Sequence, residues 1–281
     1  MKLIEPSIEH WVNSDNEKHA IKCAQVCYAS ERNIENKTAW LKAKLNAGHT
    51  SIFRHQTYYF IIPIIVITDR LKYYFTHNPY IGYYENDEWG FVSINGQTYN
   101  ETPWIKHLFK YSSSELGLIN LANYEGCAKE VEMILRKTFC ITTQISTSRE
   151  LNRVSPNNIC EQSTRYCNFN NDNFNGEVNI CKPWWFKDTE NAVQNHYLRA
   201  CEISTNVYKE LIQSGMKPQD ARGVLPLDTA TKVVYTYRVE EWKHIIDLRY
   251  YGKCGTPHPN AKIIMSDLVD KLNNELGYNT L

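Results

Sequence analysis

The alternation of hydrophobic and polar positions in the first third of the chain predicts two helices followed by a strand. Apolar residues recur every three or four positions after a Ser-Asp pair, either member of which is a good N-cap, so a helix is expected to end near Ser30. A second helix is predicted over 38–47, with Gly48 as its C-terminal cap. The continuous apolar run that follows predicts a buried strand over 56–68.

Helical periods separated by β-branched stretches dominate the rest of the chain. The segment 73–112 is rich in Tyr, Asn and Gly and has no clear period, which predicts turns and short strands in an inserted subregion. Downstream, a short helical turn is predicted to begin at Pro218 and to carry Arg222. The predicted helices cover 125–137, 190–213, 240–249 and 259–276, and the predicted strands cover 140–146 and 231–237.

The composition is typical of a globular chain, and its positive and negative charges balance. The 281 residues include 31 Lys and Arg and 31 Asp and Glu, so the formal net charge is zero, and 42% of the residues are hydrophobic. Proteins that wrap nucleic acid or coat a membrane usually carry net positive charge, so neither partner is expected. No secretory signal or membrane span stands out, and nine cysteines without a Cys-x-x-Cys pair favour reduced thiols in a cytoplasmic protein.

The densest polar cluster lies in the runs 146–153 (STSRELNR) and 161–166 (EQSTRY), on either side of a Pro-Asn-Asn turn. Arginines, hydroxyls and an amide around a turn can bind a phosphate through charge-assisted, bidentate hydrogen bonds. Composition alone slightly favours a solvated loop. Arg222 and Arg249 stand at the ends of predicted elements, although Arg249 at a helix C-terminus can also complement the helix dipole. No histidine spacing, P-loop or Gly-x-Gly-x-x-Gly run indicates a metal or a Rossmann-type site.

The order of these motifs resembles the flavin-dependent thymidylate synthases. The runs 148–153 and 161–168 (EQSTRYCN) are similar to the signature of that family. Further segments resemble the family in the same order: 27–30 (CYAS), 48–55 (GHTSIFRH) and 221–226 (ARGVLP), with 242–244 (WKH) and 248–249 (LR) downstream. The resemblance covers most of the chain and leaves mainly 73–112 outside. It makes a solvated loop at 146–166 the less favoured interpretation.

The resemblance implies a fold, an assembly and a reaction. The fold is α+β, a single domain over 1–281 with a mixed, largely antiparallel sheet flanked by long helices. The assembly is a homotetramer with active sites built between subunits. The reaction is the methylation of dUMP at C5 to dTMP, with FAD as cofactor and NADPH and methylenetetrahydrofolate as co-substrates. In this family reduced flavin supplies a hydride, and no side chain is the covalent nucleophile.

Carried over by position, the resemblance also implies the site residues. Arg249 and Ser163 are the catalytic pair, and Arg249 would lie against the uracil, where a guanidinium lowers the pKa of the imide at N3. The residues implied to hold dUMP are Glu150, Arg153, Glu161, Gln162, Ser163, Thr164, Arg165, Arg222 and Arg249. Those implied to bind the flavin are His49, Ser51, Arg153, Glu161, Arg238, His244 and His258. No metal ligand is implied.

The departures from the family pattern gather on the flavin side. Arg153 is followed by Val-Ser where the family has His-Arg, and Arg54 stands where the family has Glu. Arg238 and Glu240 replace an Asn and an Arg. Three interpretations therefore stay open: a flavin-dependent dUMP methylase, a related enzyme that modifies C5 differently, for example by hydroxymethylation, and a nucleotide-binding protein without turnover.

Overall fold

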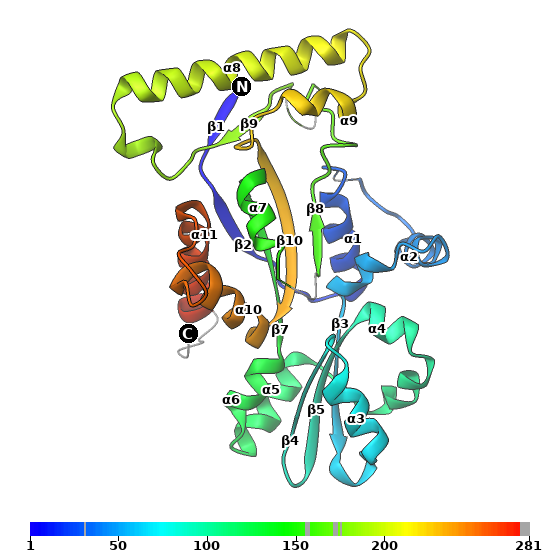
Figure 1. The fold of residues 1–281 in the computed structure, drawn as a ribbon. Coiled ribbons are helices and arrows are strands. Elements are labelled where there is room, and N and C mark those ends of the chain that lie inside the picture. The colour runs from blue at the N-terminus through cyan, green and yellow to red at the C-terminus, as the bar shows by residue number, and fades with distance from the viewer. Residues whose placement is uncertain (31, 155–157, 171–173, 175, 276–281) are drawn as a thin grey trace.

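The computed structural model describes residues 1–30, 32–154, 158–170, 174 and 176–275, and arranges their strands in three sheets (Figure 1). The central sheet contains, in order, β2 (Ser7–His10), β7 (Arg136–Gln144), β10 (Ala230–Arg238) and β8 (Ile159–Glu161), all antiparallel. The second contains β4 (Ile81–Glu85), β5 (Trp89–Asn95), β3 (Thr57–Pro63) and β6 (Ser112–Ser113), also antiparallel. β1 (Lys2–Ile4) and β9 (Asn179–Cys181) form a parallel pair. The expected α+β class with largely antiparallel pairing is confirmed.

Helices cover the sheets and connect them. The α-helices are α1 (Asn16–Val26), α2 (Lys37–Asn46), α3 (Asp69–His77), α4 (Gly96–Glu101), α5 (Glu115–Tyr124), α6 (Ala128–Ile134), α7 (Ile145–Leu151), α8 (Asn191–Gln213), α9 (Pro218–Ala221), α10 (Val239–Ile246) and α11 (Pro259–Asp270). Short 3-10 segments are Thr50–His55, Ile64–Val66, Pro103–Tyr111, Phe186–Asp188 and Arg222–Val224, and π-helical turns are Asp247–Tyr251 and Lys271–Glu275. No helix in the described ranges is long and apolar enough to cross a membrane.

Local signals in the sequence set several of these boundaries. Asp15 caps α1, because its carboxylate accepts hydrogen bonds from the backbone N–H groups of Glu17 and Lys18, each at 3.0 Å. Gly48 follows α2 with a φ of +76°, a left-handed conformation that glycine adopts without strain. The predicted helix over 190–213 is confirmed as α8, and the strand predicted over 231–237 as β10.

Several predicted boundaries were wrong. The first helix ends at Val26 and not near Ser30, and the strand expected over 140–146 is β7, which begins earlier, at Arg136, and gives way to α7 at Ile145.

The helix expected over 125–137 ends at Ile134, because the next residues begin β7 and pair in register with the last residues of β10. The apolar run 56–68 leaves the strand after Pro63, which has no N–H to donate to a neighbouring strand, and continues as a 3-10 turn.

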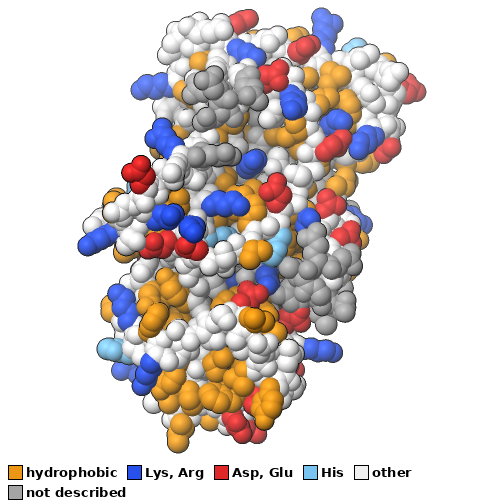
Figure 2. Space-filling view, turned by 180° about the vertical axis from the view of Figure 1, so that it is seen from behind, with side chains coloured by type: hydrophobic (Ala, Val, Ile, Leu, Met, Phe, Trp, Pro, Cys, Tyr) orange, Lys and Arg blue, Asp and Glu red, His pale blue; other side chains and the backbone are white. Residues whose placement is uncertain are grey.

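Residues 73–112 take part in the second sheet. They supply β4, which pairs with β5, and β5, which pairs with β3, and they bury a core of their own that includes Phe75, Ile81 and Val92. On the face shown in Figure 2, charged side chains of both signs mix over the upper and middle parts, and hydrophobic side chains gather at the lower end. The exposed Tyr73 and Phe109 belong to this second sheet and its helices.

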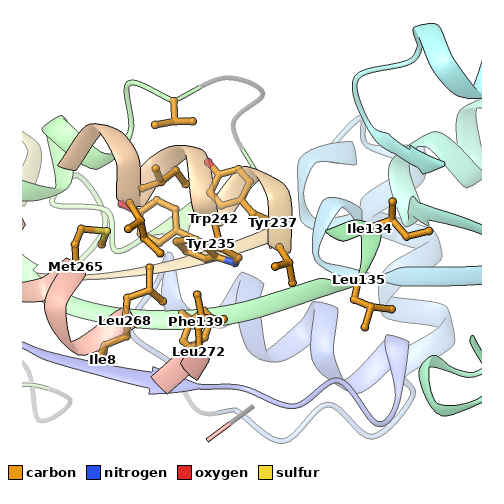
Figure 3. Packing of buried hydrophobic residues seen from close by; sticks show 14 of the residues in the cluster. Ile8, Ile134, Leu135, Phe139, Tyr235, Tyr237, Trp242, Met265, Leu268 and Leu272 are labelled. Carbon is orange, nitrogen blue, oxygen red and sulfur yellow. The ribbon is translucent and has the colours of Figure 1, made fainter. Parts of the chain in front are cut away.

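The main core lies between one face of the central sheet and the helices α10 and α11 (Figure 3). Trp242 is its centre: its ring packs edge-on against Phe139 at 5.3 Å and Tyr237 at 5.2 Å between centroids, and its Nε1 donates to the Lys137 carbonyl at 3.1 Å. These contacts fix β7 and β10, and β10 in turn positions the edge strand β8.

A buried polar row lies on the opposite face of the same two strands. The hydroxyls of Thr138 and Thr236 are 2.8 Å apart, and each contacts one histidine: His19 Nε2 lies 3.0 Å from Thr138 Oγ1, and His55 Nδ1 lies 2.8 Å from Thr236 Oγ1. Burial lowers the pKa of His19 to about 4 and that of His55 to about 3. Both imidazoles are therefore neutral at pH 7.

Candidate functional site

A cleft of about 590 Å³ opens where β8 ends, between α7 and the segment that follows α9. Its walls combine the polar turn after β8 with side chains from α7, the 3-10 turn Arg222–Val224 and the start of β10. The residues that line it are Ile145, Arg149, Glu161, Gln162, Ser163, Thr164, Arg165, Arg222, Gly223, Leu225, Pro226, Leu227 and Thr231. Six of the nine residues expected to hold dUMP are therefore brought together in one cavity.

Backbone hydrogen bonds build the turn that forms the floor of the cleft. Gln162 N donates to the Lys232 carbonyl at 2.8 Å, which extends the β8–β10 pairing by one residue. Ser163 N then donates to the Cys27 carbonyl at 3.0 Å and ties the turn to the end of α1. The Ser163 hydroxyl accepts from Arg165 N at 3.3 Å, which reverses the chain direction. The sequence from Ser163 to Arg165 thus presents its side chains along one wall.

Three guanidinium groups face this cleft from separate segments. Arg222 Nη1 donates to the Thr164 hydroxyl at 2.8 Å, and its Nε donates to the Gln219 carbonyl at 3.1 Å. The Arg165 guanidinium lies 5.5 Å from the centroid of the Tyr166 ring. Arg149 lines the cleft from α7, and all three arginine side chains are exposed. Such a group of planar, permanently charged donors suits a phosphate.

Glu161 is the one carboxylate in the cleft lining, and its oxygens already accept hydrogen bonds from other side chains of the protein. It accepts hydrogen bonds from Ser148 Oγ at 2.7 Å, Asn152 Nδ2 at 2.9 Å and Thr231 Oγ1 at 3.3 Å. Asn152 is held in turn by the Tyr235 hydroxyl at 2.8 Å. Glu161 therefore fixes the start of the turn against α7 and β10.

The other expected dUMP residues do not line this cleft. Arg249 lies in the π-helical turn Asp247–Tyr251, and its Nε donates to the Glu150 carbonyl at 3.1 Å. Arg153 is exposed just beyond α7. Arg249 therefore contacts Glu150, and neither residue lines the cleft that the Ser163 turn forms in the same chain.

The expected flavin residues lie on widely separated elements. His49 precedes the 3-10 turn Thr50–His55 and Ser51 lies within it, and both are exposed, as is His244 on α10. His258 caps α11, where its Nδ1 accepts from Asn260 N at 3.2 Å. Arg238 ends β10, at the opposite end of that strand from Thr231 in the cleft, roughly 20 Å away at strand rise.

The Arg238 side chain is also held by contacts within the protein. Its guanidinium forms ion pairs with Glu240 at 2.7 Å and Glu241 at 3.2 Å, and Nη1 donates to the Ile81 carbonyl at 2.8 Å. This arginine joins the end of β10 to the second sheet. FAD therefore fits the expected set only in part: His49, Ser51, Arg153, His244 and His258 present accessible side chains, whereas Arg238 and Glu161 serve internal contacts.

The site residues carried over from the family left out two groups that shape the cleft. Arg149 stands in the same signature run as Arg153, one helical turn earlier, and that spacing was the available signal. The Cys27 carbonyl holds the Ser163 turn through the backbone, which no side-chain pattern reveals. Among the described residues, no group of three His, Cys, Asp or Glu side chains is arranged to hold a metal ion.

Comparison with known proteins places the chain in a family. Residues 106–274 match the family model of the thymidylate synthase complementing protein. The chain belongs to this family. The match contains the cleft residues and Arg249, and the segments 27–30 and 48–55 lie outside it.

Two solved structures are similar to this chain at low sequence identity. They are crystal structures of a UMP/dUMP methylase, PolB, from Streptomyces cacaoi, bound with 5-Br UMP and with 5-Br dUMP. Their sequences are 15% and 16% identical to this one, the alignments cover 97% of this chain and 91% and 92% of theirs, and the TM-score is 0.46 for both. A search of curated proteins finds no significant sequence match.

Proposed function

We propose that this chain is a flavin-dependent thymidylate synthase that reductively methylates dUMP at C5 to give dTMP. Family membership supports an enzyme that modifies a uridine monophosphate at C5. The structural observation that carries the proposal is the convergence of Ser163, Arg165 and Arg222 in one cleft. That convergence provides a hydroxyl and two guanidiniums at the place where the sequence resemblance puts the nucleotide.

In the proposed complex the 5′-phosphate lies between the guanidiniums of Arg149, Arg165 and Arg222. Each can donate two hydrogen bonds to phosphate oxygens, and together they offset a charge of about −2. The Ser163 hydroxyl, which accepts from Arg165 N, retains its own proton to donate to the substrate. Glu161 stays with Ser148, Asn152 and Thr231 and positions the turn without contacting the anion.

In the proposed reaction, activation of the uracil ring at C5 requires Arg249. A guanidinium next to N3 stabilises the imide anion and increases the electron density at C5, which makes C5 a better carbon nucleophile. Because Arg249 meets Glu150 outside the cleft of its own chain, we propose that it serves a shared site in a homotetramer, with Glu150 and Arg153 beside it.

The cofactor belongs to the same shared site. We propose that the accessible residues His49, Ser51, Arg153, His244 and His258 hold FAD between subunits, while Arg238 and Glu161 support the surrounding backbone. When bound, reduced flavin supplies the hydride, with NADPH as its reductant and methylenetetrahydrofolate as the one-carbon donor.

The experiment that tests this proposal combines reconstitution with product analysis. The purified protein is mixed with FAD, and flavin uptake is followed by absorbance before NADPH, methylenetetrahydrofolate and dUMP are added. A nucleotide product heavier by one methyl group supports the proposal. A hydroxymethyl product identifies a different C5 modification, and dUMP binding without flavin uptake or product identifies a nucleotide-binding protein. Either of these two results overturns the proposed reaction.

A further inference from the structure

Cysteine side chains from three elements meet behind the turn that carries Ser163. Cys23 on α1, Cys140 on β7 and Cys160 on β8 pack with Val234 in one buried cluster. Cys27, at the C-terminal end of α1, packs against the same cluster and is only half-buried. The reaction proposed above uses none of these thiols.

Cys27, at the end of α1, packs against the cluster that contains Cys160, and α1 and β8 are in contact. The backbone strengthens this junction: the Cys27 carbonyl accepts from Ser163 N at 3.0 Å and from the Cys167 thiol at 3.8 Å. The Cys167 sulfur thus points at the carbonyl of Cys27, whereas Cys160 belongs to the buried cluster on which the Cys27 side chain packs. The end of α1 and the end of β8 are already in place next to each other.

Burial distinguishes the two thiols, because Cys160 is almost fully buried whereas Cys27 is half-buried. The neighbouring Cys27 thiol and burial raise the pKa of Cys160. Burial also raises the pKa of Cys140 and Cys167, each to about 11. Since reactivity requires access as well as the thiolate form, the half-buried Cys27 is the nucleophile of this cluster.

We propose that Cys27 and Cys160 form a reversible disulfide that fastens the end of α1 to β8 when the protein meets small-molecule disulfides. The Cys27 thiolate attacks one sulfur of the small disulfide, breaks its S–S bond and releases one thiolate. Cys160 then loses its proton and attacks the Cys27 sulfur, which forms the protein disulfide and releases the second thiol. The protein pair is oxidised by two electrons, and the small disulfide is reduced by two electrons to two thiols.

This bond would join two elements that hold the cleft. Cys160 immediately precedes Glu161, and the Cys27 carbonyl holds Ser163. A covalent link between residues so far apart in the sequence also restricts the unfolded chain, so the oxidised protein should unfold at a higher temperature than the reduced one.

Glutathione disulfide is the probe for the full-length folded protein, followed by alkylation and peptide mapping by mass spectrometry. The expected result is a Cys27–Cys160 linked peptide, the loss of two free thiols and a higher melting temperature, all reversed by dithiothreitol. Cys160→Ser should stop at a glutathione adduct on Cys27, and Cys27→Ser should prevent the link. Cys254→Ser, which removes an exposed thiol elsewhere, is the matched control and should leave the link intact.

Three results would overturn the proposal. One is a link between Cys27 and Cys167, the second is glutathione on Cys254 alone, and the third is no loss of thiols from the folded protein. Peptide mapping of the unsubstituted protein decides among them even if a serine variant fails to fold.

Discussion

Arg222 Nη1 donates to the Thr164 hydroxyl at 2.8 Å and thereby joins two segments that lie 58 residues apart in the sequence. The contact brings the segment after α9 onto the turn after β8, so that Arg222 and Arg165 face one cleft. A chain with zero net charge can thus hold a strongly positive site, because a mononucleotide responds to the local field and not to the total charge.

Arg222→Ala should weaken dUMP binding by about 1.5–3 kcal/mol, the range for hydrogen bonds to charged groups. Arg222→Lys should restore only part of this loss, since an ammonium lacks the planar fork. Calorimetric titration with dUMP measures both. Arg199→Ala, which removes an exposed arginine from α8, is the matched control and should leave the affinity unchanged. Equal affinities for the Arg222 and Arg199 variants would remove Arg222 from the site.

Glu161→Ala should lower the free energy of unfolding by about 1–3 kcal/mol, because it leaves Ser148, Asn152 and Thr231 without their shared acceptor. Glu161→Gln should cost less, as one amide oxygen still accepts. Urea unfolding provides the measurement. Glu202→Ala, an exposed carboxylate on α8, serves as the control. If the Glu161 and Glu202 variants were equally stable, the carboxylate would not hold the turn.

Acid should destabilise the protein through its buried histidines. His19 and His55 titrate near pH 6.5 in the unfolded chain, but their folded pKa values are about 4 and about 3. Below pH 6.5 the unfolded state binds more protons, so the free energy of unfolding falls with pH by about 1.4 kcal/mol per unit for each histidine. Urea unfolding at a series of pH values from 6.5 down to about 4 measures this slope.

His19→Gln should flatten that pH dependence and keep a hydrogen-bonding group near Thr138. His196→Gln, which replaces an exposed histidine on α8, should leave the slope as it is in the unsubstituted protein. An identical slope in the His19 variant would mean that this histidine is not held neutral in the folded state.

Arg249→Ala should abolish turnover while the protein stays folded. Within the chain the side chain contributes one hydrogen bond to the Glu150 carbonyl, worth about 1 kcal/mol, whereas the proposed reaction depends on its charge at the uracil. Product formation by mass analysis and circular dichroism separate the two roles. Undiminished product from the folded variant would contradict the role assigned to Arg249.

Elements with local signals in the sequence were predicted, whereas pairing between distant segments was missed. The Asp15 side chain caps the start of α1 and Gly48 follows the end of α2, so the start of α1 and both ends of α2 were close to the prediction, whereas α1 ends at Val26 and not near Ser30. The division of the strands into three sheets depends on register between distant segments, such as β3 with β5, which periodicity does not encode. The same long-range pairing turned the expected end of the 125–137 helix into the start of β7.

The candidate site likewise contains residues that the sequence predicted correctly and one that it misplaced. Glu161, Gln162, Ser163, Thr164 and Arg165 are contiguous, so one motif predicted them together. Arg238 was expected at the flavin because it stands at a position that contacts flavin in the family, but its side chain pairs with Glu240 and Glu241 on α10 and donates to the Ile81 carbonyl of the second sheet.

The most direct test of the nucleotide site compares the binding of dUMP and of deoxyuridine, which differ only in the phosphate. Calorimetry is carried out on the unsubstituted protein and on the double variant Arg165→Ala, Arg222→Ala. If the guanidiniums hold the phosphate, the preference for dUMP over deoxyuridine should fall by about tenfold or more in the double variant, which corresponds to at least ~1.4 kcal/mol, while the affinity for deoxyuridine stays the same. An unchanged preference for dUMP would show that the phosphate binds elsewhere and would contradict the site.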